Sequence, residues 1–452
     1  MNTRRIGAAA LVVLLGGCSL DVTDFDVSDL RFSKKSSNKA FVVGDEPYAV
    51  RTAATLISQG GNAVDAAAAM YFALSVTYPV SAGLGGGGIC LVHDPKTHRN
   101  FEFDFLARSA TSNGTFAVPG AVRGMAQMQT SFGALPWQRV VSPAEGLAAV
   151  GFPISQALAA RLSAASDVVR LDAGLAAEFL DESGKVREAG SVVANPALGE
   201  TLAAIRVQGS DALYAGPIAE RIAAYAASQG GAITQAEIAA YRAQRSKPLE
   251  LSMGETQIAL PGASTGAGIF AGKLFAEILR AELAQSGNAN TEAAVVEGTK
   301  RALSGFAVSD LPHDLGATGF AATDNSGQAV ACAMTMNGPF GSGHSVPGVG
   351  VTLARAPASS TAGLASAFLT PVLATDAQGN LALAGAGAGG PVGTASIADA
   401  LARLAKGEAV TRRASNAANG DTLYDTVNAI LCQNDSCTAL PDAGASGLGM
   451  AP

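Results

Sequence analysis

Charge is scarce in this sequence of 452 residues. Asp, Glu, Lys and Arg make up 15% of it, against about 25% in an average soluble protein. The 30 basic side chains are outnumbered by 37 acidic ones, which gives a formal net charge of −7. A protein that binds nucleic acid needs a basic patch or arm for the phosphates, so this balance excludes nucleic acid as a partner.

Long apolar runs are also missing after residue 20. A transmembrane helix requires about 20 consecutive apolar residues, and every stretch here is interrupted sooner by charge, proline or clustered glycine. The chain is nevertheless 48% hydrophobic and holds 53 glycines without the strict period of collagen. Such a sequence is predicted to bury a sizeable core, as one large domain or two moderate ones.

The first residues have the pattern of an export signal. Arg4 and Arg5 precede an apolar stretch, residues 6–15, that is too short to span a bilayer. The string that ends at Cys18 resembles a bacterial lipobox, in which cleavage before the cysteine accompanies acylation of its sulfur. Residues 1–17 are therefore predicted to be a lipoprotein signal peptide, and a plain signal peptide with an incidental cysteine is the alternative.

Lipidation at Cys18 would tie the mature chain to a membrane. Residues 18–39, polar and rich in Ser, Asp and Lys, are predicted to be a flexible tether. Ser19 resembles the residue that follows the cysteine in lipoproteins sent to the outer membrane. The predicted location is the bacterial cell envelope, with the protein anchored in the outer membrane and facing the periplasm.

An exported protein meets an oxidising compartment, so the four remaining cysteines carry information. Cys432 and Cys437 are spaced for a small disulfide loop. A metal pair is the rival interpretation, but the four histidines are scattered and none completes a site. Cys90 and Cys332 lie in apolar, strand-like runs and are predicted to be buried thiols.

Helix and strand signals follow one another without a βαβ repeat. Helical spacing from Tyr48 stops at Gly60, and Asn62 is predicted to cap a second helix that ends before Pro79. A block of helices separates two groups of strands. This arrangement predicts an α+β or layered α/β protein rather than a doubly wound sheet.

Two glycine-containing motifs in this region carry a family resemblance. Residues 60–67 read GGNAVDAA and residues 79–88 read PVSAGLGGGG, which is similar to the γ-glutamyltransferase (glutathione hydrolase) family. Further collinear motifs extend the resemblance from about Phe41 to Glu408. It implies the N-terminal-nucleophile hydrolase fold, an α+β four-layer αββα sandwich.

The resemblance also implies boundaries and ligands. Residues 40–410 would form the γ-glutamyltransferase-like domain, with a large-subunit-like part at 40–316 and a small-subunit-like part at 317–410. Residues 411–452 would be a C-terminal tail that carries the cysteine loop. The family acts on γ-glutamyl compounds and needs no cofactor or metal, so a γ-glutamyl or other small amino-acid-like molecule is the expected ligand.

Family chemistry depends on a threonine that becomes the chain's new N-terminus. The precursor cleaves itself before this residue, whose hydroxyl then attacks the substrate while its freed α-amine acts as base. Alignment on Asp324 places Ala317 at the nucleophile. Thr318 would serve only if the register slips by one residue. Thr335 and Asn337 match the residues that support the nucleophile.

The groups that would bind substrate are unevenly retained. Gly389 and Gly390 match the glycine pair whose N–H groups form the oxyanion hole. Leu106 replaces the family arginine, and Arg108 is a candidate substitute because a two-residue step on a strand keeps the same face. The remaining substrate-binding and serine positions are occupied by Ala354, Arg355, Ala356, Ser359, Ala367 and Phe368.

A second motif competes with this interpretation. Residues 385–390 satisfy G-x-G-x-x-G after a strand and before a helix, as a dinucleotide-binding loop would, but no βαβ unit follows. Two hypotheses remain. The chain is either a membrane-tethered γ-glutamyl hydrolase or transferase with an altered site, or a degenerate homologue that binds or scaffolds without acyl transfer. The missing site residues favour the second.

Overall fold

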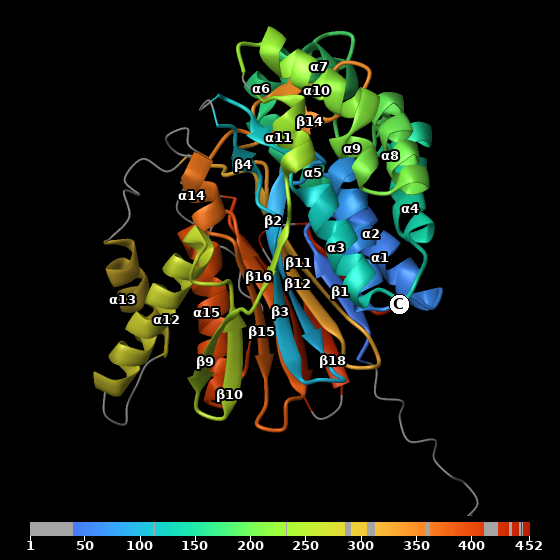
Figure 1. Ribbon diagram of the computed structural model, residues 1–452. Coiled ribbons are helices and arrows are strands. Elements are labelled where there is room, and N and C mark those ends of the chain that lie inside the picture. Colours follow the sequence, from blue (N-terminus) through green and yellow to red (C-terminus); the bar gives the residue numbers. More distant parts are fainter. Residues whose placement is uncertain are drawn as a thin grey trace, which may run out of the picture. The chain divides into compact units, whose positions relative to one another are not determined.

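Two antiparallel β-sheets lie face to face, and each is covered on its outer side by helices (Figure 1). The computed structural model describes residues 39–111, 114–231, 233–284, 291–304, 312–357, 362–410, 424–433, 436–442, 444 and 446–452. All of them belong to one unit that spans Asn38–Pro452. Cys18, the predicted signal peptide and the tether up to residue 38 lie outside the described residues.

The first sheet contains the strand that begins at Ala317. The strands of this sheet follow one another in the order β19 (Leu448–Met450), β1 (Phe41–Gly44), β11 (Ala317–Thr323), β12 (Ala329–Thr335), β2 (Gly87–Asp94), β3 (Arg99–Asp104) and β8 (Gln244–Ser246). The second sheet has the order β18 (Ser436–Leu440), β17 (Thr426–Gln433), β16 (Leu381–Ala388), β15 (Thr370–Thr375), β10 (Thr256–Leu260) and β9 (Leu249–Met253). Strands β11 and β12 pack against β16 and β15, which makes this contact the centre of the sandwich.

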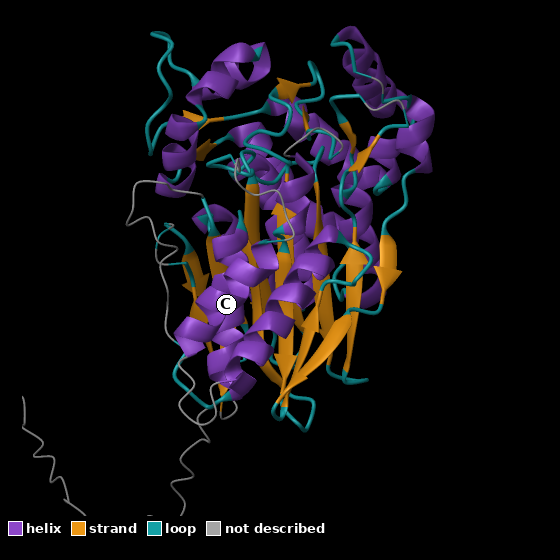
Figure 2. Ribbon diagram, turned by 90° about the vertical axis from the view of Figure 1, so that its left-hand side faces the viewer, coloured by secondary structure: helices purple, strands orange, loops and turns teal. Residues whose placement is uncertain are grey.

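Helices form the two outer layers (Figure 2). Against the first sheet lie α1 (Pro47–Ser58), α2 (Ala63–Thr77) and α3 (Ala121–Phe132), and α4 (Trp137–Val150) packs on α2. Against the second lie α12 (Gly266–Ala284) and α15 (Pro391–Ala405), with α13 (Thr291–Leu303) packed on both of these helices and α14 (Ala362–Ala367) on α12. The predicted four layers of an αββα sandwich are present.

A further group of helices and short strands gathers at one end of the sheets (Figure 1). The helices are α5 (Gln156–Ala164), α6 (Ser166–Leu171), α7 (Ala173–Phe179), α8 (Pro196–Gln208), α9 (Asp211–Tyr214), α10 (Gly216–Ser228) and α11 (Gln235–Ala240). Three two-stranded pairs accompany them: β4 (Arg108–Ser109) with β5 (Ala117–Val118), β6 (Phe152–Pro153) with β7 (Val192–Val193), and β13 (His344–Ser345) with β14 (Thr352–Leu353).

Helix α2 shows how the sequence directs this architecture. All of its residues are buried, because it lies between the first sheet and the helices α1, α3 and α4. A helix that is apolar all round can be stable only in such an interior position. The predicted cap is confirmed: the Asn62 side chain accepts hydrogen bonds from the N–H groups of Val64 and Asp65.

The C-terminal residues are part of the sandwich. Strands β17 and β18 extend the second sheet beyond β16, and β19 then pairs with β1 at the edge of the first sheet. The expectation of a tail that is separate from a domain ending at residue 410 does not match this arrangement. The partners of these strands are far away in the sequence, so only the pairing in the two sheets reveals where the strands lie.

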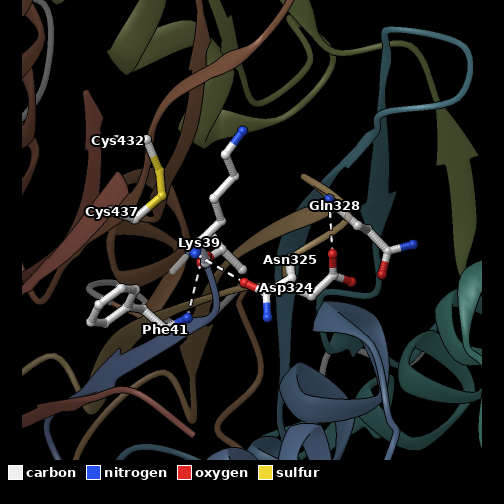
Figure 3. Close-up of a disulfide and its surroundings, with 8 residues drawn as sticks. Lys39, Phe41, Asp324, Asn325, Gln328, Cys432 and Cys437 are labelled. Atoms are coloured by element: carbon white, nitrogen blue, oxygen red, sulfur yellow. Dashed lines mark hydrogen bonds between the residues drawn. A yellow bond between two sulfur atoms is a disulfide. The ribbon is translucent and has the colours of Figure 1, made fainter. Parts of the chain in front are cut away.

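Both cysteine pairs in the described part of the chain form disulfides. Cys432 and Cys437 face each other across the β17–β18 hairpin, close to Lys39 where β1 begins (Figure 3). The prediction that Cys90 and Cys332 are thiols is wrong. These two residues stand directly opposite each other on β2 and β12 and are bridged.

In the part of the chain that the structure describes, no helix combines the length and the apolar character that crossing a bilayer needs.

Candidate functional site

Ala317 is the first residue of strand β11, and its side chain belongs to an apolar cluster. It pairs with Thr335 of β12, and its side chain is completely buried. Its methyl group belongs to a cluster that also contains Ile89, Leu106, Ala267, Ala333, Leu369, Ala386 and Ala388. Positions 317 and 106, which the family resemblance assigns to a nucleophile and a substrate-binding arginine, are therefore neighbours within one apolar cluster.

Hydrogen bonds fix the backbone on the N-terminal side of Ala317. The Thr335 hydroxyl lies 3.2 Å from the Leu315 carbonyl and 3.1 Å from the Gly316 carbonyl. Gly316 has φ 59°, and a Cβ there would lie 1.9 Å from the carbonyl oxygen of Gly338. Only glycine fits this position, and the segment therefore turns sharply into β11.

Arg161 and Asp314 add a buried ion pair to this segment. Arg161, from α5, donates through Nε to Asp314 at 3.0 Å and through Nη1 to the Ala317 carbonyl at 3.2 Å. Asp314 also accepts from the Gly316 N–H at 2.7 Å. Burial acts against the guanidinium charge, but Asp314 and Tyr78 nevertheless raise the pKa of Arg161 above its usual value. No motif in the sequence identified this pair.

Thr318 lies on the other face of β11. Successive side chains of a strand point to opposite sides, and the Thr318 hydroxyl donates to the Asp45 carboxylate at 2.7 Å. Asn428 donates to the other oxygen of Asp45, also at 2.7 Å. Burial raises the pKa of Asp45 to about 6, while these two hydrogen bonds act to lower it. The hydroxyl of Thr318 is thus fully buried in a network apart from the cluster around Ala317.

Thr335 pairs with Ala317 across β12 and β11, and Asn337 follows two residues later. The Thr335 hydroxyl accepts from the Asn337 N–H at 2.8 Å, and the Asn337 amide donates to the Arg355 carbonyl at 2.8 Å. Asn337 itself has φ 59°. Among the described residues, its buried Oδ1 has no hydrogen-bond partner. Both side chains thus hydrogen-bond to backbone groups near the start of β11, where residue 317 itself has no hydroxyl.

Gly389 and Gly390 lie between β16 and α15, directly after Ala388 of the apolar cluster. A Cβ on Gly389 would lie 2.2 Å from the Tyr424 carbonyl oxygen, and one on Gly390 would lie 2.7 Å from an Asp425 carboxylate oxygen. Close packing against backbone, together with φ 93°, therefore requires glycine at 389, whereas at 390 only the Asp425 side chain is in the way. The alternative dinucleotide loop is not formed, because residues 385–388 are strand, paired on both sides with β15 and β17.

Arg108 does not replace the missing arginine in the way that the spacing suggested. Strand β3 ends at Asp104, and Arg108 begins the separate strand β4. The two-residue rule for a shared strand face therefore does not apply to Leu106 and Arg108. Arg108 instead pairs with Asp104 at 2.7 Å, and 43% of its side chain is exposed.

Two of the other substituted positions, Ala354 and Phe368, lie in apolar packing, while the guanidinium of Arg355 lies close to Gly338. Ala354 contacts Ala107, Ala117 and Met336 in a small buried cluster, and Phe368 packs edge-on against Phe270. Ser359 lies outside the described residues. No group of three or more His, Cys, Asp or Glu residues in the described ranges has the arrangement of a metal site.

The profile of the family described as gamma-glutamyltranspeptidase matches residues 49–305. This match covers more than half of the chain and ends before Ala317.

Curated relatives agree with the profile. The glutathione hydrolase proenzyme of Escherichia coli (strain K12) is 30% identical over 293 residues, which are 58% of this chain and 50% of that protein. The acylase ACY 1 proenzyme of Pseudomonas sp. (strain SE83) is 30% identical over 272 residues, or 54% and 48% of the two chains. The chain thus spans about half the length of the curated relatives it matches.

Solved structures support the predicted fold. The cephalosporin acylase from Bacillus halodurans superimposes with a TM-score of 0.75 at 17% identity, over 92% of this chain and 96% of that one. The γ-glutamyltranspeptidase of Helicobacter pylori gives a TM-score of 0.52 at 25% identity, over 57% and 80% of the two chains. The α+β sandwich of the N-terminal-nucleophile hydrolase type is confirmed.

Proposed function

Because the chain belongs to the γ-glutamyltranspeptidase family, we propose that it is a member that performs no γ-glutamyl transfer and serves as a binding or scaffolding protein of the cell envelope. The observation that carries this proposal is Ala317 in its apolar cluster. A methyl group has no lone pair with which to attack a peptide bond or a γ-glutamyl amide. Neither self-cleavage nor acyl transfer can start from this residue.

Two further features support the same conclusion. Leu106 offers no charge to a substrate carboxylate, and its side chain fills space beside Ala317. The Gly316–Ala317 link is held by Arg161, Asp314 and Thr335. These contacts stabilise a continuous chain at the position where relatives are expected to be cleaved.

Catalytic γ-glutamyl hydrolysis or transfer is the second candidate. It is favoured by Thr335, Asn337 and the Gly389–Gly390 pair, and by relatives that are named glutathione hydrolases. Thr318 would have to supply the hydroxyl. Its side chain is buried and donates to Asp45, so the strand would have to slip by one residue.

A denaturing gel and an activity assay distinguish the two candidates. The purified full chain is expected to run as a single polypeptide and to release no p-nitroaniline from a γ-glutamyl anilide. Two fragments split near residue 316, or a release that is lost in Thr318→Val, would contradict the proposal. Ala317→Thr is the matched variant, because it places a hydroxyl, together with one methyl group, next to Thr335.

Anchoring through Cys18 is a separate part of the proposal. It depends on the lipobox-like string alone, and metabolic labelling tests it. Radiolabelled palmitate is expected in the wild-type chain and absent from Cys18→Ser, which should be recovered in the soluble periplasmic fraction. Ser19→Asp, which keeps the cysteine, should remain labelled but should no longer be found in the outer membrane. Equal labelling of the wild type and Cys18→Ser would exclude the anchor.

A further inference from the structure

A cavity of about 650 Å³ opens among the helices at the end of the sandwich where α7, α10 and β14 lie (Figure 1). Its walls come from four segments: α7 with the residue before it, the approach to α8, one face of α10, and residues 344–350 between β13 and β14. The volume is within the range of about 300–1,000 Å³ that small-molecule sites occupy. None of the residues assigned above to the family's catalytic chemistry lines it.

The cavity has carboxyl groups but no basic side chain. Its polar lining consists of Asp172, Glu178, Asn195, Tyr225, Gln229, His344 and Ser345, and no Lys or Arg is among the lining residues. Neither carboxyl forms an ion pair in the described part of the chain. Arg221 of α10 is near but donates to the Gly348 carbonyl at 3.2 Å. The lining therefore holds two carboxyl groups and no lysine or arginine side chain to pair with them.

Neutral groups hold both carboxyls in place. Asp172, which is buried, accepts from the N–H groups of Leu175 at 2.9 Å and Ser345 at 3.2 Å and is hydrogen-bonded to the Tyr225 hydroxyl. Asn195 donates to one oxygen of Glu178 at 2.9 Å. Burial raises the pKa of Glu178 to about 8, and only the Asn195 hydrogen bond acts against it. A cation beside Glu178 would supply the compensating charge that the protein itself does not provide.

Aromatic rings complete the same wall. The Tyr225 and His344 rings lie 6.5 Å apart, and Phe116 packs behind His344 with ring centroids at 5.3 Å. The Nδ1 of His344 lies 2.9 Å from the Ser342 carbonyl, which assigns the proton to Nδ1 and leaves Nε2 as an acceptor. Rings next to carboxylates attract an organic cation by cation–π and charge interactions together.

From these observations we propose that the cavity binds a small organic ammonium compound, with its ammonium group between Asp172 and Glu178 and beside the Tyr225 ring. Ala177, Pro196 and Val346 provide apolar wall for the aliphatic part of such a ligand. This site is independent of residue 317, so it stands whether or not the chain transfers γ-glutamyl groups.

Calorimetric titration of the full chain with 1,4-diaminobutane tests the proposal. Succinate and 1,4-butanediol are the matched anionic and neutral probes of similar length. The diamine is expected to bind and to raise the thermal midpoint, while the other two probes have no effect. No heat from the diamine at millimolar concentration, or equal binding of the diol, overturns the proposal.

Three variants locate the site. Glu178→Gln and Asp172→Asn should each weaken diamine binding by about tenfold or more, the loss expected for a charge-assisted contact. Glu182→Gln alters an exposed carboxyl that does not line the cavity and should bind as the wild type does. Asp172 also caps α7, so Glu178→Gln decides the matter if Asp172→Asn does not fold. Unchanged affinity in a folded Glu178→Gln chain overturns the proposal.

Discussion

Arg161 of α5 donates to the backbone carbonyl of Ala317, the residue that the family resemblance aligns with the nucleophile. The guanidinium is only 2% exposed and is paired with Asp314, three residues before Ala317 in the chain. Tyr78 and Tyr424 flank it at 5.5 and 5.0 Å from their ring centroids. A single side chain thus connects the helical end of the molecule to the start of β11.

Arg161→Met is predicted to destabilise the protein by about 3–5 kcal/mol, because removal of one partner leaves Asp314 buried without its counter-charge. Urea unfolding monitored by circular dichroism measures this loss. Arg170→Met is the control, since it breaks an exposed pair with Asp167 and should cost less than about 1 kcal/mol. Similar losses in the two variants would show that the buried pair has no special role.

The two disulfides are predicted to contribute unequally. Cys90 and Cys332 are separated by 242 residues and Cys432 and Cys437 by 5. From the loss of chain entropy in the unfolded state, the disulfide that closes the long loop is expected to stabilise the protein by about 5 kcal/mol. The disulfide that closes the short loop is expected to contribute about 2 kcal/mol. Cys90→Ala with Cys332→Ala should therefore lower the free energy of unfolding more than Cys432→Ala with Cys437→Ala. The reverse order would mean that native packing, not chain entropy, sets the difference.

Thr318→Val is predicted to lower stability by about 1–3 kcal/mol, because it leaves the buried carboxylate of Asp45 without one of its donors. A double-mutant cycle with Asp45→Asn separates this contact from the rest of the network. The expected coupling is well above zero. Additive losses from the two substitutions would show that Thr318 and Asp45 do not interact.

Stability is predicted to fall as the pH rises from about 4 to about 7, and Asp425 is one cause. Burial raises the pKa of Asp425 to about 7, with Asp442 adding to the effect and the Gly393 N–H acting against it. The native state therefore retains a proton that the unfolded chain releases above pH of about 4, so rising pH favours unfolding.

Asp425→Asn tests this by removing the titrating group while keeping an oxygen for the Gly393 N–H. Raising the pKa of one carboxyl from about 4 to about 7 lowers the free energy of unfolding by about 4 kcal/mol between these two pH values. The variant should lose this contribution to the slope of stability against pH. Urea titrations at several pH values measure it, with the exposed Glu182→Gln as control. An unchanged slope in Asp425→Asn would assign the pH dependence to other buried carboxyls.

Local signals in the sequence predicted much of the fold. The Asn62 cap, the end of α1 at Gly60–Gly61 and the Cys432–Cys437 hairpin each depend on residues a few positions apart, and each is present. The glycine motifs at residues 60–67 and 79–88 identified the family for the same reason. These motifs form turns and close backbone contacts that only particular residues allow.

Contacts between distant segments were not predictable in this way. The Cys90–Cys332 bridge follows from the register of β2 against β12, and the Arg161–Asp314 pair joins residues 153 positions apart. Nothing near any of these residues indicates its partner. Arg108 was misplaced because residues 105–107 leave the strand between Asp104 and Arg108, which changes the face on which it lies.

The sequence by itself determined that positions 317 and 106 hold alanine and leucine, and the family resemblance aligns these positions with a nucleophile and an arginine. Only the tertiary structure decided what those substitutions mean together. It brings both residues into one apolar cluster and turns Thr318 to the opposite side, toward Asp45. The physical reason is the two-residue period of a strand, which makes the face of each side chain depend on pairing with segments far away in the chain.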